Sequence, residues 1–192
     1  MFKIDDDVRA LIFDIDGTLA DTMPVHYKAW QTVCEKVGFD YPETVFYELA
    51  GIPTVKIVPI LNERFGLSFD DNTIREKESA FINLISEVKP IKPVMDIAER
   101  YKGKMPISCG TGGRRDLVLM TLKAIGFEDF FDIIVASEDV GNHKPFPDTF
   151  LKCAELMKVN PEDCLVFEDG ELGIEAAKRA GMKCIDITRY IE

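Results

Sequence analysis

LIFDIDGTLADT, residues Leu11 to Thr22, is an apolar run that changes abruptly into an acidic turn. The apolar residues at its start, together with the residues directly before them, predict a short strand from Val8 to Phe13. This strand is expected to be buried on both faces of a sheet. Asp14 and Asp16 come directly after it. Asp-Gly is a common turn pair, so one interpretation is a turn with solvated acids. The residues at the ends of the other strands decide between that interpretation and a functional one.

Downstream of Pro93 the chain alternates between short apolar runs and amphipathic stretches. The runs typical of strands are KMPISCG, FDIIVAS, DCLVFED and MKCIDI, and the stretches between them have helical spacing. Strands that alternate with helices indicate a parallel sheet with helices on both faces. The sequence therefore predicts an α/β fold with a doubly wound, Rossmann-like sheet.

The segment from Pro24 to about Val88 has a different texture. Its apolar residues recur at helical spacing, and little in it is typical of a strand. We therefore expect two domains, a Rossmann-like core formed by residues 1–20 and 91–192, and a helical cap, residues 21–90, inserted after the first strand.

Composition narrows the classes of partner. The 192 residues carry a net charge of -11, which disfavours nucleic acid and anionic membranes as partners. No apolar run is long enough to span a membrane, and the acidic start MFKIDDDVRA is unlike a leader.

The 5 cysteines form no C-x-x-C pair, which favours reduced core residues of a cytoplasmic protein. We expect a monomer.

Polar residues follow four of the predicted strands at the point where each ends. They are two aspartates, a hydroxyl in a glycine-rich turn, a lysine and an acidic pair, namely Asp14, Asp16, Thr111, Gly112, Lys144, Glu168 and Asp169. Because the carboxyl ends of parallel strands meet at one edge of a sheet, where ligands bind, these residues are expected to share a site.

The residue types at this edge indicate phosphoryl chemistry. Four carboxylates around one point repel each other unless a cation lies among them, and oxygen ligands alone favour Mg²⁺. A hydroxyl and backbone N–H groups at a glycine-rich helix start suit a phosphoryl group. An ionised aspartate can attack phosphorus, and a second carboxyl two residues along can serve as acid and then base.

FDIDGTLADT, the Gly-Thr-Gly turn, HKPFPDTF and VFEDGELGIEAAKRAG together resemble the haloacid dehalogenase superfamily of phosphotransferases. The resemblance covers nearly the whole chain. The helical insert resembles the β-phosphoglucomutase-like branch, which also holds small sugar-phosphate phosphatases. The resemblance implies that Asp14 is the nucleophile and Asp16 the acid/base.

The same resemblance implies the remaining roles. Mg²⁺ would be held by Asp14, the backbone carbonyl of Asp16 and Asp169, with Glu168 in or beside the coordination shell. The substrate phosphate would be bound by residues of the turns and by a lysine, namely Gly17, Thr18, Thr111, Gly112 and Lys144. A histidine at the place of His26 approaches the substrate in the mutase branch, and a polar helix start is the alternative.

Some positions remain open. Thr111 competes with Ser108 as the phosphate ligand, and Thr111 is preferred because Ser108 falls inside the predicted strand. Arg114 and Arg115 begin the next helix, and we expect them on a solvated face; the alternative is that they face the phosphate edge.

The expected function is an Mg²⁺-dependent phosphatase of small phosphorylated metabolites, of the hexose or fructose phosphate type, that forms an aspartyl-phosphate. The alternative is a β-phosphoglucomutase-type phosphohexomutase. In the mutases that the chain resembles, the cap loop carries basic residues, whereas this chain has Ala50 and Thr54 at those places. Lys56 and Lys77 are the cap lysines that could replace them. A non-catalytic binding module is a third, remote alternative.

Overall fold

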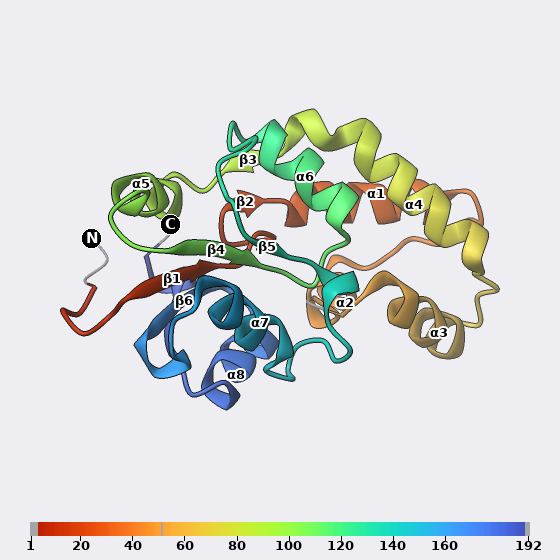
Figure 1. Ribbon diagram of the computed structural model, residues 1–192. Coiled ribbons are helices and arrows are strands. Elements are labelled where there is room, and N and C mark those ends of the chain that lie inside the picture. Colours follow the sequence, from red (N-terminus) through yellow and green to blue (C-terminus); the bar gives the residue numbers. More distant parts are fainter. Residues whose placement is uncertain (1–3, 51, 191–192) are drawn as a thin grey trace. The chain divides into compact units, whose positions relative to one another are not determined.

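The computed structural model describes residues 4–50 and 52–190, and the chain divides into two compact units. One unit is formed by Met1–Asp21 together with Lys89–Glu192, and the other is Thr22–Val88. The first unit is built on a parallel five-stranded sheet with the order β5-β4-β1-β6-β7 (Figure 1). These strands are β1 (Ala10–Phe13), β4 (Ile107–Gly110), β5 (Ile134–Val135), β6 (Cys164–Glu168) and β7 (Lys183–Asp186). The predicted α/β, doubly wound fold class is confirmed.

The central strand β1 is buried along its whole length, as its unbroken apolar sequence predicts. It pairs with β4 on one side, where Leu11 faces Ile107, and with β6 on the other, where Leu11 faces Leu165. One further hydrogen bond, 3.0 Å from the Asp14 amide to the Phe167 carbonyl, continues the ladder past the strand. The backbone of Asp14 is therefore fixed at the carboxyl end of the central strand.

Helices cover both faces of this sheet. Figure 1 shows α7 (Asp148–Met157) and α8 (Glu171–Arg179) on one face, and α5 (Lys92–Tyr101) and α6 (Arg115–Ala124) on the other. Alternate side chains of the strands enter the two layers, so Ile12 packs with Phe150 of α7 and Ala176 of α8.

The chain order of the strands creates a switch point beside β1. After β1 the chain builds β4 and β5 on one side of it, and then returns to build β6 and β7 on the other. The connections that follow β1 and β6 therefore run in opposite directions along the sheet. In open α/β sheets, ligands bind at the carboxyl ends of the strands beside such a switch point.

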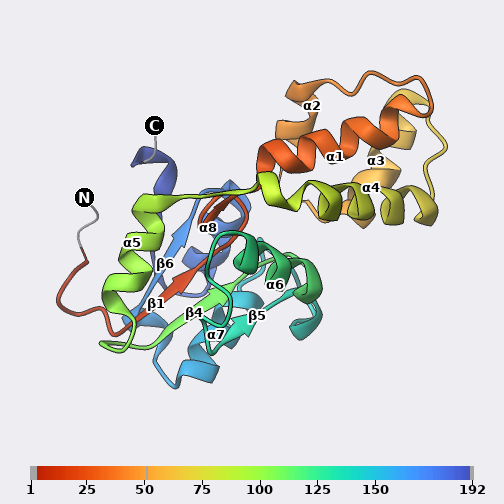
Figure 2. The same cartoon turned by 90° about the horizontal axis from the view of Figure 1, so that it is seen from above.

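The second unit consists of helices (Figure 2). They are α1 (Met23–Glu35), α2 (Glu43–Glu48), α3 (Thr54–Phe65) and α4 (Asp71–Leu84), followed by a 3-10 turn, Ile85–Glu87. Their apolar faces enclose a core rich in aromatic rings, which includes Trp30, Tyr41 and Phe46. Asp70 caps α4, because its carboxylate accepts hydrogen bonds from the amides of Asn72 and Thr73.

A small antiparallel pair lies where the chain leaves and re-enters the sheet unit. β2 (Ala20–Asp21) pairs with β3 (Lys89–Pro90), so that Ala20 faces Pro90 and Asp21 faces Lys89. Strands this short carry no detectable sequence pattern, and the sequence did not predict them. Among the described residues, no helix combines the length and the apolar character that crossing a membrane requires.

Candidate active site

A buried ion triad stands at the switch point of the sheet. Lys144 Nζ lies 2.6 Å from Asp14 Oδ1 and 2.7 Å from Glu168 Oε2. Asp14 and Glu168 are each 4% exposed. Asp14 follows β1 and Glu168 ends β6, so neighbouring strands present the two carboxylates, and the loop after β5 brings the lysine between them.

Asp169 joins this cluster through the turn that follows β1. Thr18 Oγ1 donates a 2.8 Å hydrogen bond to Asp169 Oδ1, and Thr18 itself is fully buried. Gly17 makes the close approach possible, since its φ is 84° and a Cβ at this position would overlap the Asp169 carboxylate. Gly17 and Thr18 therefore fix the position of the Asp169 carboxylate. The sequence alone does not predict these contacts with Asp169.

The carboxylates form a set that fits a divalent metal ion. Asp14, Glu168 and Asp169 each offer an oxygen, and these oxygens lie within 4.8 Å of one another. When all are ionised, three carboxylates and the single Lys144 ammonium leave two surplus negative charges. Oxygen donors of this kind, with that charge, fit Mg²⁺ better than a softer metal.

Burial and mutual repulsion act strongly on the acids of this cluster. Burial raises the pKa of Asp14 well above its ordinary value, repulsion by Glu168 adds to this, and Lys144 opposes it. Burial followed by repulsion from Glu168 raises the pKa of Asp169 to about 7. Burial acts to lower the pKa of Lys144, but the attraction of its ammonium to Asp14 and Glu168 outweighs this and raises the pKa above the ordinary value. The lysine is therefore charged, and the acids favour a cation in their midst.

Glu168 is held by its backbone surroundings as well as by Lys144. The Gly170 amide donates a 3.1 Å hydrogen bond to Glu168 Oε1. Gly173 in the first turn of α8 lies so close that a Cβ there would overlap the Glu168 carboxylate. Glu168 thus has one oxygen on the amide and the other on the lysine, which fixes its orientation.

Asp16 and Thr111 both lie close to Gly113 in the turn between β4 and α6. A Cβ placed on Gly113 would lie 3.4 Å from Asp16 Oδ2 and 3.4 Å from Thr111 Oγ1. Thr111 Oγ1 accepts a 3.0 Å hydrogen bond from the Gly113 amide, which folds the turn back on itself. The glycines leave this turn open, and nothing would lie within 4 Å of a Cβ at Gly112.

Ser108, the competing candidate for a phosphate ligand, has a different setting. It lies inside β4, is fully buried, and its hydroxyl has no hydrogen-bond partner among the described residues. Thr111 comes one residue after the end of the strand, where the ligand edge is. The setting favours Thr111.

His26 and Lys77 come together within the helical unit. Lys77 Nζ lies 2.9 Å from His26 Nδ1, and the His26 ring stacks on Phe81 with ring centroids 4.1 Å apart. Lys77 is 4% exposed, and its ammonium also lies over the ring of Trp30 at 5.9 Å. The role of His26 toward a substrate stays a prediction.

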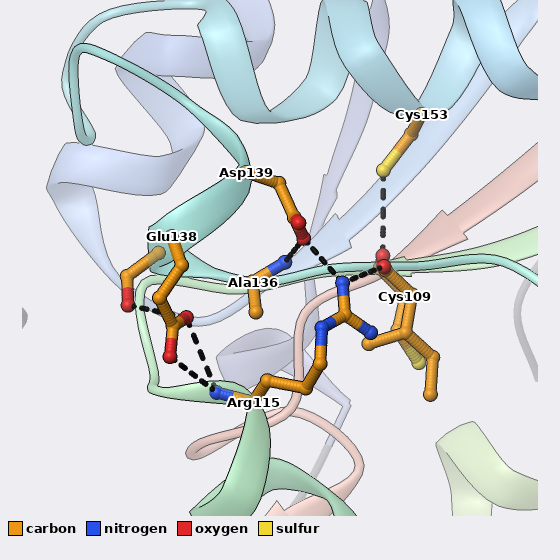
Figure 3. A network of polar contacts seen from close by, with 8 residues as sticks. Cys109, Arg115, Ala136, Glu138, Asp139 and Cys153 are labelled. Carbon is orange, nitrogen blue, oxygen red and sulfur yellow. Dashed lines mark hydrogen bonds and ion pairs between the residues drawn. The ribbon is translucent and has the colours of Figure 1, made fainter.

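The two arginines at the start of α6 differ from each other. Arg114 pairs with Asp116 of its own helix at 2.6 Å, both half exposed. Arg115 reaches instead to the Ile134 carbonyl of β5 and to Asp139 in the segment after β5, and Figure 3 shows the contact with Asp139. The side chain of Arg115 is 42% exposed and so lies partly in solvent, but it also has acceptors on β5 and in the segment after it, which helix periodicity does not reveal.

Comparison with known proteins shows which family the chain resembles over most of its length. A family model described as haloacid dehalogenase-like hydrolase matches residues 11–187. The chain is 40% identical over 179 residues to fructose-1-phosphate phosphatase YqaB of Escherichia coli, covering 92% of this chain and 95% of that protein. It is 32% identical to a phosphorylated carbohydrates phosphatase of Thermotoga maritima, covering 93% of this chain and 84% of that protein.

A solved structure is similar over the same length. The crystal structure of β-phosphoglucomutase from Clostridium difficile matches with a TM-score of 0.81 and 29% identity, covering 92% of this chain and 83% of that one. The similar proteins thus include both phosphatases and a mutase.

Proposed function

The chain belongs to the haloacid dehalogenase-like hydrolases and is a phosphatase, and from this premise we propose that it hydrolyses sugar phosphates of the hexose or fructose type with Mg²⁺. The observation that carries the proposal is the buried cluster in which Lys144 contacts Asp14 and Glu168. The name of the relative from Escherichia coli makes fructose 1-phosphate the first substrate to test.

The proposed first step is attack by Asp14. A carboxylate oxygen of Asp14 forms a bond to phosphorus while the bond from phosphorus to the sugar oxygen breaks. Asp16 donates its proton to that leaving oxygen, and the sugar departs as an alcohol. Lys144 and Thr111, with the amides of the open turn at Gly112, bind the phosphoryl oxygens.

The second step restores the enzyme. Asp16, now a carboxylate, takes a proton from water, and the water oxygen attacks phosphorus. The bond from phosphorus to Asp14 breaks, which frees the carboxylate and releases inorganic phosphate. Asp14, Asp169 and the backbone carbonyl of Asp16, with Glu168 beside them, would hold Mg²⁺, whose charge offsets that of the carboxylates and the phosphoryl group.

A panel of sugar phosphates tests the proposal. Released phosphate is measured with Mg²⁺, after EDTA, and after Mg²⁺ is restored, for fructose 1-phosphate, fructose 6-phosphate and the glucose phosphates. We expect turnover of at least one sugar phosphate, loss with EDTA and recovery with Mg²⁺. Activity that survives exhaustive chelation would contradict the metal assignment.

The cellular setting is part of the same proposal. All five cysteines are free thiols, and four of them are buried. Burial raises the pKa of Cys153 to about 12, so this thiol is protonated and unreactive. Free thiols support a reducing compartment such as the cytoplasm.

A further inference from the structure

Arg115 begins α6 and joins that helix to β5 and to the segment after β5. Its Nη2 donates to the Ile134 carbonyl at 2.9 Å and pairs with Asp139 Oδ2. Its backbone amide donates to both oxygens of Glu138 at 3.2 Å. A free amide at a helix start needs an acceptor, and here a different element supplies it. Figure 3 shows the contacts of Arg115 with Glu138 and Asp139, which belong to the 3-10 turn η2 (Ser137–Asp139).

The turn η2 is in contact with the proposed phosphate-binding turn as well. The Ser137 amide donates to the Gly113 carbonyl at 3.0 Å. Asp139 Oδ2, which Arg115 contacts, also accepts a 2.7 Å hydrogen bond from the Ala136 amide. The Ser137 amide thus joins η2 to the turn with Thr111, and Asp139 accepts hydrogen bonds from Arg115 and Ala136 directly before the loop that carries Lys144, residues 140–147, called here the lysine loop.

The far end of the lysine loop is anchored separately. Asn142 Nδ2 donates to Asp148 Oδ1 at 3.0 Å, which ties the loop to the first residue of α7. One helical turn further, Cys153 Sγ donates to the Cys109 carbonyl of β4 at 3.4 Å (Figure 3). Lys144 therefore lies between two anchors, and Asp139, five residues before it, belongs to the first.

From this arrangement we propose that Arg115 is a positioning residue, which through Asp139 holds the Lys144 loop and the Thr111 turn in register. The proposal rests on the proposed roles of Lys144 and Thr111. Arg115 touches none of the reacting groups, so its effect passes through the backbone it holds.

The geometry explains why such a residue matters. Lys144 makes contacts of 2.6 and 2.7 Å with two carboxylates, and these tolerate little displacement. The pair that Arg115 forms with Asp139 has side chains 42% and 32% exposed, so its value for overall stability is small. A variant at this position should therefore change catalysis more than folding.

Four variants test the proposal. Arg115→Met removes the contacts and keeps the aliphatic stem, and Arg115→Lys keeps a cation for Asp139. Arg179→Met is the matched control, because Arg179 is 46% exposed and pairs with Glu175 on α8 at 2.8 Å. Lys144→Met tests the proposed function itself.

Two measurements separate positioning from folding. Turnover of p-nitrophenyl phosphate with Mg²⁺ gives kcat and KM. Calorimetric titration with inorganic phosphate, carried out well below the melting temperature, gives the affinity of each variant for phosphate. We expect Arg115→Met to lower kcat roughly ten- to a hundredfold and to weaken phosphate binding about tenfold, because small misplacements are costly. Arg115→Lys should recover a large part of both, and Arg179→Met should match the wild type.

The outcomes are distinct. If Arg115→Met keeps kcat and phosphate affinity within about twofold of the wild type, or if Arg115→Lys recovers nothing, the proposal is wrong. If Lys144→Met binds phosphate as tightly as the wild type, the assignment of Lys144 as a phosphate ligand in the proposed function is wrong. Loss in Lys144→Met with no loss in Arg115→Met contradicts the positioning role alone.

Discussion

In the proposed mechanism Asp14 attacks phosphorus, and it is also one of three acids whose oxygens lie within 4.8 Å of one another. Asp14→Asn should lower phosphatase activity by at least about 10³-fold, because an amide is a poor nucleophile and a poorer metal ligand. Steady-state release of phosphate from a sugar phosphate checks this. Asp132→Asn, at an exposed acid outside the cluster, is the control and should stay active. Appreciable turnover in a verified Asp14→Asn preparation would contradict the assignment.

Gly17 allows a comparison with a glycine of similar backbone. Gly17 and Gly103 have φ values of 84° and 76°, but only at Gly17 would a Cβ meet another group, the Asp169 carboxylate. Gly103→Ala should cost about 1 kcal/mol of unfolding free energy for the positive φ. Gly17→Ala should cost roughly 1–3 kcal/mol more, because Asp169 must move.

Urea denaturation measures both costs, and phosphatase assays complete the test. Only Gly17→Ala should lose activity as well as stability. Equal losses of stability at the two positions would show that the contact with Asp169 has no energetic weight.

Asp169 makes the stability of the metal-free protein depend on pH. Its pKa rises from 3.8 to about 7 on folding, so between these values the folded state binds more protons than the unfolded state. The free energy of unfolding should therefore fall as pH rises through this window, by up to about 1.4 kcal/mol per unit from this group. Above the folded pKa the contribution is constant.

Urea denaturation in EDTA at pH 5 and pH 7 checks this expectation. Asp169→Asn should flatten the pH dependence, and saturating Mg²⁺ should reduce it, because the metal binds the ionised acid. Asp132→Asn serves as the control and should keep the wild-type slope. An unchanged slope in Asp169→Asn would show that another group is responsible.

At the scale of the elements, α8 shows how packing overrides helix propensity. Gly173→Ala alone would favour a helix by about 1 kcal/mol. The new methyl would overlap the Glu168 carboxylate and push it off Lys144, and disturbing a buried ion pair costs several kcal/mol. We therefore expect a net loss of about 1–3 kcal/mol in urea denaturation.

A second substitution tests the cause of that loss. In the double variant with Glu168→Asp the acid is shorter by one methylene, so the added methyl has room. If the overlap is the cause, Gly173→Ala should cost less in the Glu168→Asp background than in the wild type. An equal cost in both backgrounds would point to a different origin.

The elements also show what sequence can predict. The strand β1, with its continuous apolar run, and the helices with 3.6-residue periodicity follow from local patterns. The shared position of the strand ends is also predictable, because the carboxyl ends of parallel strands lie at one edge of the sheet. The strands β2 and β3 are not predictable, because two residues are too few to show a periodic pattern.

The finer contacts at the site depend on residues far apart in the chain. Thr18 binds Asp169, 151 residues away, and Arg115 pairs with Asp139, 24 residues away. Nothing in the local sequence of either residue marks its partner. Helix periodicity at Arg115 indicates only a polar face, and a threonine in a turn is common in itself.

For the molecule as a whole, the sequence favours net hydrolysis over phosphate transfer between sugar positions. A mutase must hold a second phosphate with cations, each charge-assisted contact being worth roughly 1.5–3 kcal/mol. Ala50 and Thr54 supply no charge, and losing two such contacts weakens binding by on the order of a hundredfold or more.

We therefore expect phosphate release from hexose monophosphates with little interconversion of 1- and 6-phosphates. Product analysis with and without a hexose bisphosphate activator measures the ratio. Isomerisation of β-glucose 1-phosphate well above phosphate release would reverse this ranking. Ala substitutions at Lys56 and Lys77 would then test which lysine replaces the missing cations.

The short ladder of β2 and β3 has a consequence for how such a protein can change over generations. Because Ala20 faces Pro90 and Asp21 faces Lys89, the segment between them starts and finishes on adjacent strands, about 5 Å apart. Any inserted domain whose two ends lie that close could be connected to β2 and β3 without disturbing Asp14 or the sheet. A replacement of the helical unit would therefore leave the backbone connections of the sheet unit, and with them the position of Asp14 at the end of β1, unchanged.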